Sequence, residues 1–200
     1  MGNRNIVLAS TSRHRRELLQ RAGLGAVICV APTSDEEVDD ETITPLALVE
    51  TLAERKARSV GSSFPEALII GADQVVELEG AVLGKPGTEA RAVDQLLALS
   101  GREHRLLTGL CVFEPRTGRV EVGVDVHCMK MWPLGRSRLE RYVTYDQPLD
   151  CAGSYRVESA GVTLFQSMAG EDFTAIVGLP LCQLSELLSR FGVTLFDLVS

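Results

Sequence analysis

Residues 69–86 read IIGADQVVELEGAVLGKP, and this stretch decides the fold. The apolar runs 68–70 and 75–78 flank a short polar segment and together predict one long strand. The Glu-Gly pair at 79–80 is a two-residue turn signal, and the apolar residues 81–83 follow it. The stretch therefore predicts a β-hairpin in which the residues just before and just after the turn pair with each other.

The register of this hairpin places three polar side chains at its open end. Extended outward from the turn, it sets Gln74 opposite Lys85, with Asp73 just beyond them. A carboxylate, an amide and an ammonium group in one place are suited to holding a metal-bound phosphate and activating a water molecule. A surface ion pair beside a hairpin glycine explains the same residues equally well, so both interpretations stay open at this point.

Strands and helices alternate along the rest of the chain. Residues 6–9 predict a short buried strand, and Ser12 is the expected N-cap of a helix from 13 to 22. Thr44 and Pro45 are typical of the start of another helix, which should end near residue 60. Further helices are expected at 88–100, 133–145 and 180–191, and further strands at 104–113 and 120–131 with a hairpin loop at 115–118. This order predicts an α/β fold with a mixed sheet.

Composition limits the functional classes. The 200 residues, 45% of them apolar and 24% charged, form a globular chain of one domain spanning 1–200. A net charge of -7 argues against binding a nucleic acid polymer, although a small anionic ligand needs only a local basic pocket. No apolar run approaches the roughly 20 residues of a membrane span, and the N-terminus lacks a signal-peptide core, so we expect a cytoplasmic protein. The five cysteines are widely spaced and include no C-x-x-C pair, which indicates neither a disulfide framework nor a zinc site.

A cluster of basic residues opens the first predicted helix. Residues 10–16 read STSRHRR, so a strand end, a polar turn and a helix start meet there, with Arg15 and His14 in the first helical turn. Backbone N–H groups and the helix dipole both favour an anion at such a position, and arginine binds phosphate through two hydrogen bonds. The alternative is an exposed basic turn paired with Glu17 and neighbouring acids.

Three other segments carry candidate residues. Lys56 lies near the apolar stripe of the second predicted helix and is placed to extend into a cleft, although a solvated lysine is the commoner case. Glu36 lies in an acidic stretch and is a candidate metal contact, or one of a run of solvated charges. In the stretch 151–158, CAGSYRVE, Glu158 is suited to accept hydrogen bonds from the N–H groups of a guanine edge, or faces water as an ordinary strand acid. Residues 177–180, VGLP, are interpreted as a strand end followed by a helix start, with no functional role.

Taken together, the segments resemble the Maf family of nucleotide pyrophosphatases. The matching pieces occur in a consistent order over nearly the whole chain: LASTSRHRRELL (8–19), LAERKA (52–57), IIGADQVVELEGAVLGKP (69–86), TGL (108–110), CAGSYRVES (151–159) and IVGLPL (176–181). Each piece alone is weak, but the ordered set is specific.

The resemblance implies a fold of two lobes flanking a deep nucleotide-binding cleft, and metal-dependent cleavage between the α and β phosphates of a nucleoside triphosphate. Asp73 matches the family's proton acceptor. Arg15, Lys56 and Lys85 match its phosphate-binding residues, and Glu36 matches an acid that helps to hold a divalent cation, Mg²⁺ or Mn²⁺. A small triphosphate is the expected partner, and a homodimer is the usual state of a small soluble enzyme.

The substrate branch is indicated by the stretch that ends at Glu158. CAGSYRVE is similar to the branch that hydrolyses 7-methyl-GTP, because the dTTP/UTP branch has glutamine at the position of Glu158. A carboxylate suits 7-methylguanine, which is positively charged and presents N–H donors. Arg13 stands where the family has proline, and His14 stands where tryptophan or arginine is expected. Gln74, His14 and Glu158 are the expected specificity residues. The alternatives are a dTTP/UTP pyrophosphatase and, in another class, a non-catalytic nucleotide-binding regulator of septum formation.

Overall fold

The structure, a computed structural model, describes residues 5–34, 38 and 42–199. The chain forms two compact units. The first consists of the residues up to Asp73, the segment Thr108–Asp125 and the residues from Asp172 onward, and the second of Gln74–Leu107 and Val126–Glu171. Three long strands begin in one unit and end in the other. Neither unit is therefore a single continuous stretch of sequence.

The described residues form one sheet of seven strands, in the order β2-β1-β3-β5-β6-β7, with β4 paired to β3. The strands are β1 (Ile6–Ala9), β2 (Ile28–Val30), β3 (Leu68–Leu78), β4 (Ala81–Leu83), β5 (Glu103–Glu114), β6 (Arg119–Met131) and β7 (Phe165–Ala169). The α-helices are α1 (Arg13–Arg21), α2 (Pro45–Ser59), α3 (Glu89–Leu99), α4 (Arg136–Asp146), α5 (Phe173–Ile176) and α6 (Leu181–Ser189). Short 3-10 segments occur at Gly61–Ser63, Ala152–Ser154 (η2), Ala160–Leu164 (η3) and Leu195–Leu198.

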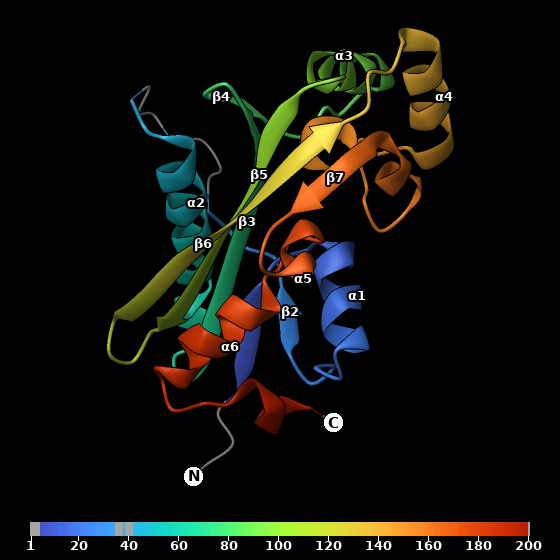
Figure 1. The fold of residues 1–200 in the computed structure, drawn as a ribbon. Coiled ribbons are helices and arrows are strands. Elements are labelled where there is room, and N and C mark those ends of the chain that lie inside the picture. Colours follow the sequence, from blue (N-terminus) through green and yellow to red (C-terminus); the bar gives the residue numbers. More distant parts are fainter. Residues whose placement is uncertain (1–4, 35–37, 39–41, 200) are drawn as a thin grey trace. The chain divides into compact units, whose positions relative to one another are not determined.

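In the first unit, β1 lies between β2 and β3 and is parallel to both. Its register pairs Leu8 with Cys29 on one side and with Ile70 on the other. β1 and the part of β3 in this unit are buried on both faces, which explains their continuous apolar runs. Figure 1 shows α1 and α2 on opposite sides of these strands.

Alternation along the strands divides the core of the first unit into two layers. One layer packs against α1 and α6 and contains Ile6, Leu8, Leu68, Ile70, Leu110, Val112, Leu19, Leu184, Leu187 and Leu188. The other layer packs against α2 and contains Val7, Ala9, Ile69, Cys111, Phe113, Ala53 and Ala57. Successive side chains of β1 and β3 thus enter different layers, as the two-residue period of a strand requires.

In the second unit α3 packs against α4, and α3 also contacts η2 while α4 contacts η3. The rings of His104, Tyr155 and Phe165 form a cluster, with centroids 4.9 to 5.9 Å apart. Burial lowers the pKa of His104 to about 4, despite the opposing effect of the Glu77 charge. The ring is therefore neutral at physiological pH.

The α/β fold with a mixed sheet is confirmed, because parallel and antiparallel pairs occur together. The helix starts after Ser12, Thr44 and Thr88 are also confirmed, and each of these side chains accepts a backbone N–H of its helix. The strand β2, the strand β7 and the helix α5 were not predicted, since each is five residues or shorter and carries little periodicity. The two compact units match the expected number of lobes, and the cleft stays a prediction.

The predicted hairpin is correct near its turn and shorter than expected at its open end. Val76 pairs with Leu83 and Leu78 with Ala81, which is the predicted register. β4 ends at Leu83, so the ladder stops before the expected pairing of Gln74 with Lys85. Within the part of the chain that the structure describes, no helix has the length and apolar character needed to cross a membrane.

Candidate functional site

The carboxyl end of β1, and the part of β3 just beyond its pairing with β1, lie where the chain reverses its direction across the sheet. From β1 the chain passes through α1 to β2 on one side, and it then returns through α2 to β3 on the other side. The two connecting helices belong to different core layers. Ligands of α/β proteins bind outside the carboxyl ends of the strands at such a switch point. The edge just beyond Ala9 and Ile70 is therefore the position at which a site is expected.

Asp73 and Lys56 form a buried ion pair at this edge. The Nζ atom of Lys56 lies 2.6 Å from Oδ1 of Asp73, and the two side chains are only 8% and 12% exposed. Alternation along β3 puts Asp73 on the same face as Ile69, which is the face that α2 covers. Lys56 follows Ala53 by three residues in the buried stripe of α2. The two periodicities bring the carboxylate and the ammonium group together.

Gly71 determines how closely α2 approaches β3. A Cβ atom at this position would lie 2.0 Å from the carbonyl oxygen of Ala53 and 2.8 Å from the nitrogen of Ala57. Only a hydrogen atom fits there, so the helix backbone packs directly on the strand. This approach brings the side chain of Lys56 within hydrogen-bonding distance of Asp73.

Arg15 belongs to α1, which packs on the other face of the sheet. The side chain of Ser12 caps the helix by accepting the backbone N–H of Arg15. The guanidinium group donates from Nε to the carbonyl oxygen of Gly178 at 2.7 Å and from Nη1 to the hydroxyl of Ser10 at 3.3 Å. Both of these acceptors are uncharged, so the two bonds orient the guanidinium group without cancelling its charge. An oriented arginine at a helix N-terminus is suited to a phosphate.

The other basic residues of this helix turn have different surroundings. Arg13 donates to Glu17 at 2.7 Å, and its side chain is 84% exposed. An exposed pair of this kind contributes little to stability or binding, so the surface-pair interpretation is correct for Arg13. His14 is half-buried in the same turn.

The remaining predicted site residues belong to the second unit or are not described. Gln74 is half-buried and follows Asp73 on β3. Lys85 is exposed, two residues beyond the end of β4, and Glu158 is exposed between η2 and η3. Glu36 lies outside the described residues. The structure thus brings Asp73 and Lys56 into contact and places Arg15 beyond the end of the neighbouring strand.

Gln95 of α3 connects two of the predicted segments in the second unit. Its amide nitrogen donates to the carbonyl oxygen of Gly84 at 3.2 Å, and its amide oxygen accepts the hydroxyl of Ser154. Ser154 has a φ of +65°, which is uncommon for a residue other than glycine. Gln95 therefore ties the loop that carries Lys85 to the turn that leads to Glu158.

Asp146 supports the turn on which Glu158 lies. Its buried carboxylate accepts the hydroxyl groups of Tyr142 at 2.9 Å and of Ser159. The hydroxyl of Tyr142 in turn accepts the backbone N–H of Arg156 at 3.0 Å. Burial raises the pKa of Tyr142, so this hydroxyl stays protonated and donates to the carboxylate. Residues 156 and 159, on either side of Glu158, are thus both linked to α4.

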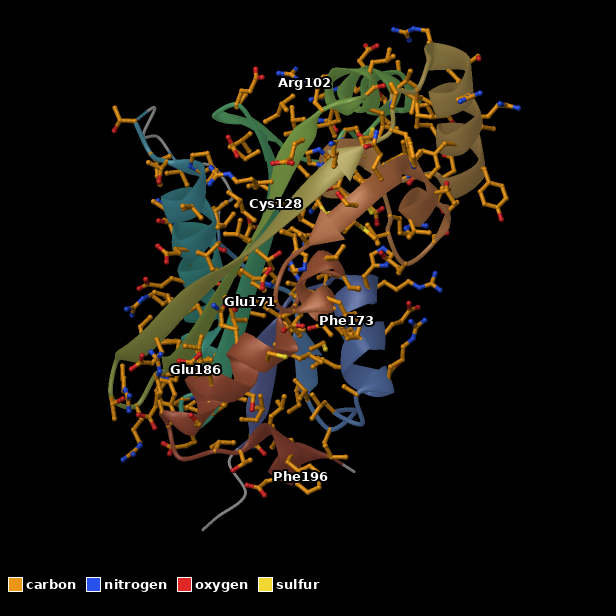
Figure 2. The ribbon with its side chains drawn as sticks, in the orientation of Figure 1. Arg102, Cys128, Glu171, Phe173, Glu186 and Phe196 are labelled. Atoms are coloured by element: carbon orange, nitrogen blue, oxygen red, sulfur yellow. The ribbon has the colours of Figure 1, made fainter. Side chains whose placement is uncertain are left out.

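Sequence reasoning missed the roles of Gly178, Gln95 and Asp146. The interpretation of residues 177–180 as a strand end is wrong, because they form the turn after the four-residue helix α5. Phe173, labelled in Figure 2, opens that helix, and its side chain is exposed. The available signal was a glycine two residues before proline, which is typical of a turn. Gln95 and Asp146 give no signal of this kind, because their partners are distant in the sequence.

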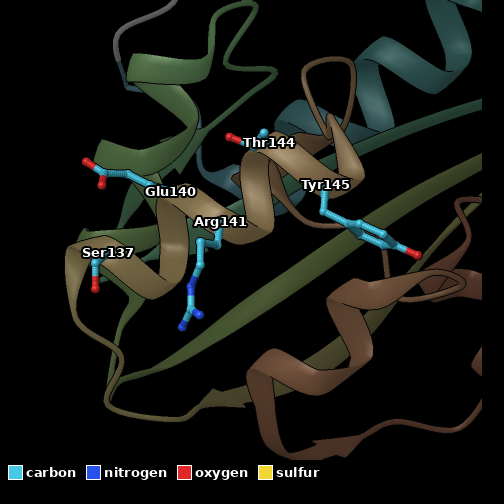
Figure 3. Close-up of a pocket in the computed structure, with 5 residues that line it drawn as sticks. All are labelled: Ser137, Glu140, Arg141, Thr144 and Tyr145. Carbon is cyan, nitrogen blue, oxygen red and sulfur yellow. The ribbon is translucent and has the colours of Figure 1, made fainter.

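A hollow on the second unit is lined by none of these residues. Ser137, Glu140, Arg141, Thr144 and Tyr145 line it, and all five belong to α4 (Figure 3). Their spacing of three, four, seven and eight residues places them on one exposed face of the helix. A hollow lined by a single exposed helix face, with none of the predicted site residues, is not a candidate for the catalytic site.

Several known proteins are similar to this chain in sequence or in fold. The chain is 41% identical over 192 residues to a 7-methyl-GTP pyrophosphatase of Bdellovibrio bacteriovorus, covering 95% of this chain and 98% of that protein. It is 44% identical over 188 residues to a 7-methyl-GTP pyrophosphatase of Pseudomonas putida, covering 94% and 97%. Among solved structures, a HAM1 protein from Coxiella burnetii is similar in fold, with a TM-score of 0.50 and 17% identity over 94% of this chain and 100% of that one. The profile of the family described as "Maf-like protein" matches residues 5–191, and the chain belongs to this family.

Proposed function

We propose that the protein hydrolyses 7-methyl-GTP to 7-methyl-GMP and pyrophosphate. The observation that carries this proposal is the buried contact between Asp73 and Lys56 at the switch point of the sheet. A carboxylate fixed by an ammonium group at a ligand-binding edge is suited to activating water beside a phosphate. The names of the two relatives at 41% and 44% identity support the same reaction and the same substrate.

In the proposed reaction, Asp73 accepts a proton from a water molecule. The water oxygen bonds to the α-phosphorus, the bond from that phosphorus to the oxygen bridging to the β-phosphate breaks, and pyrophosphate leaves with the bonding electrons. Lys56 holds Oδ1 of Asp73 at 2.6 Å and so limits the directions in which the carboxylate can accept the proton.

We assign the binding of the phosphates to three positive residues, Arg15, Lys56 and Lys85. Arg15 is oriented by Gly178 and Ser10 at the N-terminus of α1, where backbone N–H groups also favour an anion. Lys85 is exposed and lies on a loop that Gln95 holds. Together with Lys56, they stabilise the charge that develops on the departing pyrophosphate.

A divalent cation fits the donor chemistry at Asp73. Carboxylate oxygens are the ligands that Mg²⁺ and Mn²⁺ prefer, and Asp73 presents such a group at the edge. We assign Asp73, with Glu36, as the residues that would hold the cation, which when bound neutralises phosphate charge.

Glu158 selects the base in this proposal. Its carboxylate complements the positive charge and the N–H donors of 7-methylguanine, whereas the uncharged base of dTTP or UTP lacks that charge. Gln74 and His14 are assigned to further base contacts. The fixed turn between Arg156 and Ser159 limits the positions that Glu158 can take.

A pyrophosphate-release assay with 7-methyl-GTP, GTP, dTTP and UTP, each with Mg²⁺, with Mn²⁺ and with a chelator, tests the proposal. We expect 7-methyl-GTP to have the highest kcat/KM, and metal to be required. We expect Asp73→Asn to reduce kcat by roughly 10² to 10⁴, the usual contribution of a general base. A preference for dTTP or UTP would assign the protein to the dTTP/UTP branch of the family. Tight triphosphate binding with no hydrolysis under either metal would favour the nucleotide-binding regulator.

A further inference from the structure

Asp172 is a buried carboxylate that the proposed reaction does not use. The residue is 4% exposed and caps α5. Its Oδ1 atom accepts the backbone N–H of Thr174 at 2.9 Å and the hydroxyl of Thr174, and its Oδ2 atom accepts the backbone N–H of Cys182 at 2.7 Å. Burying a carboxylate is costly unless such donors surround it. Three donors offset the cost of burying the Asp172 carboxylate. We therefore expect this carboxylate to hold the local structure together.

Thr174 completes the closure of the segment that Asp172 begins. Its hydroxyl donates to Asp172 and accepts the backbone N–H of Leu181 at 2.8 Å. The two side chains therefore connect the start of α5 with the start of α6 and close residues 172–182 into one loop. Leu179, inside this loop, is fully buried in the core layer of α6, so the loop is fixed at its ends and in its interior.

Gly178 lies within this closed loop in a conformation that favours glycine. Its φ is +107°, and its N–H donates to the carbonyl oxygen of Ala175 at 2.8 Å. The hydroxyl of Thr108, on β5, donates to the same carbonyl oxygen at 3.1 Å. These bonds fix the peptide that ends at Gly178, and the carbonyl oxygen of Gly178 accepts Nε of Arg15 at 2.7 Å.

We propose that Asp172 and Thr174 are positioning residues for the guanidinium group of Arg15. They act through the loop, by holding the carbonyl oxygen of Gly178 where Nε of Arg15 donates to it. This inference rests on the proposed function, in which Arg15 binds phosphate. The three donors named above satisfy the charge of Asp172 within the loop, and an uncharged carbonyl reaches Arg15. The bond that directs Arg15 thus ends on a neutral acceptor and brings no negative charge to the guanidinium group.

The direct test observes the Nε–H group of Arg15 by ¹H–¹⁵N NMR, with the resonance assigned by its loss in Arg15→Lys. We expect slow exchange with water in the wild type, because the group donates to a fixed carbonyl. Thr174→Val, which keeps the shape of the side chain and removes the hydroxyl, should speed the exchange at least tenfold. Asp172→Asn should do the same, since its amide group presents N–H where an acceptor is needed. Thr174→Ser should keep most of the protection.

A matched control removes a threonine hydroxyl elsewhere. Thr163 also donates to a backbone carbonyl, that of Ala160 at 2.7 Å, on the exposed surface of the second unit. Thr163→Val should leave the Arg15 signal unchanged. Exchange of Arg15 Nε–H that is equally slow in the wild type, Thr174→Val and Asp172→Asn overturns the proposal, and so does exchange that is already fast in the wild type.

A double-mutant cycle then tests whether the effect reaches the ligand through Arg15. The probe is a non-hydrolysable α,β-methylene analogue of 7-methyl-GTP, and binding is measured by calorimetry. Thr174→Val should weaken binding by roughly five- to tenfold in the wild-type background and less than twofold in the Arg15→Ala background, because coupled residues are not additive. An equal loss in both backgrounds means that the loop acts on the fold generally, and it overturns the proposal.

The two experiments separate this inference from the proposed function. If no triphosphate is hydrolysed, yet the NMR signal responds and the analogue binds through Arg15, the positioning role stands and the reaction assignment is wrong. If Arg15→Ala binds the analogue as well as the wild type does, the phosphate role of Arg15 fails, and the positioning proposal fails with it.

Discussion

The Nζ atom of Lys56 lies 2.6 Å from Oδ1 of Asp73, with both side chains almost completely shielded from water. Removing one partner takes the ion pair away from the buried charge of the other, and we expect Lys56→Met or Asp73→Asn to lower the free energy of unfolding by about 3 to 5 kcal/mol. The double variant Lys56→Met/Asp73→Asn should lose less than the sum of the two, because no charge remains. Urea denaturation measures all four proteins. Additive losses would show that the two groups do not interact, contrary to the structure.

Gly71 gives a prediction about packing between α2 and β3. In Gly71→Ala the new methyl group would lie 2.0 Å from the carbonyl oxygen of Ala53, a backbone atom that cannot rotate away. We expect a loss of roughly 3 kcal/mol or more in the free energy of unfolding, together with a lower kcat as Lys56 is displaced from Asp73. Gly25→Ala is the matched control, since a Cβ atom there meets nothing within 4 Å. A Gly71→Ala protein as stable and active as Gly25→Ala would contradict the close approach.

Gln95 gives a prediction about the second unit. Gln95→Glu has nearly the same shape but no N–H group for the carbonyl oxygen of Gly84, and its charge repels that oxygen. We expect the KM for 7-methyl-GTP to rise roughly five- to tenfold, with stability reduced by about 1 kcal/mol, because the loop carrying Lys85 loses its support. Gln166→Glu makes the same change at an exposed position of the same unit and should leave KM unaltered. Equal KM values for the two variants would exclude this role.

Glu158 gives a prediction about the base. In Glu158→Gln the side chain keeps one acceptor but loses the charge that complements 7-methylguanine. We expect kcat/KM for 7-methyl-GTP to fall roughly tenfold, which corresponds to about 1.4 kcal/mol, while kcat/KM for GTP changes less. The ratio of the two constants is the measurement. An unchanged ratio would assign base selection to other residues, such as Gln74 and His14.

His104 gives a prediction about pH. Burial lowers its pKa from an ordinary 6.5 to about 4 in the folded state, so the unfolded chain binds the proton more tightly. Stability that is fully present above pH 6.5 should therefore be lost as the pH falls toward 4, by up to roughly 3 kcal/mol. His104→Phe keeps a ring against Tyr155 and Phe165 and should flatten this pH dependence, whatever its stability at neutral pH. Denaturation curves between pH 4 and pH 8 provide the slope. The same slope in both proteins would rule out His104 as its source.

Local signals in the sequence predicted the features that depend on neighbouring residues. The caps at Ser12, Thr44 and Thr88 and the hairpin turn at Glu79 and Gly80 need only a few adjacent side chains, and all are confirmed. The burial of Lys56 also follows from its place near an apolar stripe. The two-residue period of β3 and the helical period of α2 then place Asp73 and Lys56 on facing sides of these two elements.

Contacts between distant segments could not be predicted in this way. The bond from Arg15 to Gly178 joins residues 163 positions apart, and that from Thr108 to Ala175 joins residues 67 apart. No periodicity in either segment specifies its partner, because the partner is chosen by how the sheet and α6 pack. The short elements β2, β7 and α5 were missed for a related reason: tertiary contacts determine them, and their own few residues do not.

The passage of β3, β5 and β6 through both units has a consequence for protein engineering. The peptide bonds after residues 73, 107, 125 and 171 are the four places at which the chain moves from one unit to the other. A gene fragment ending anywhere near the middle of the sequence would encode neither unit whole. A chimaera that takes its whole second unit from another family member must be spliced at all four points. The first of these junctions falls between Asp73 and Gln74, and one inserted residue there would turn every following side chain of that strand to the opposite face.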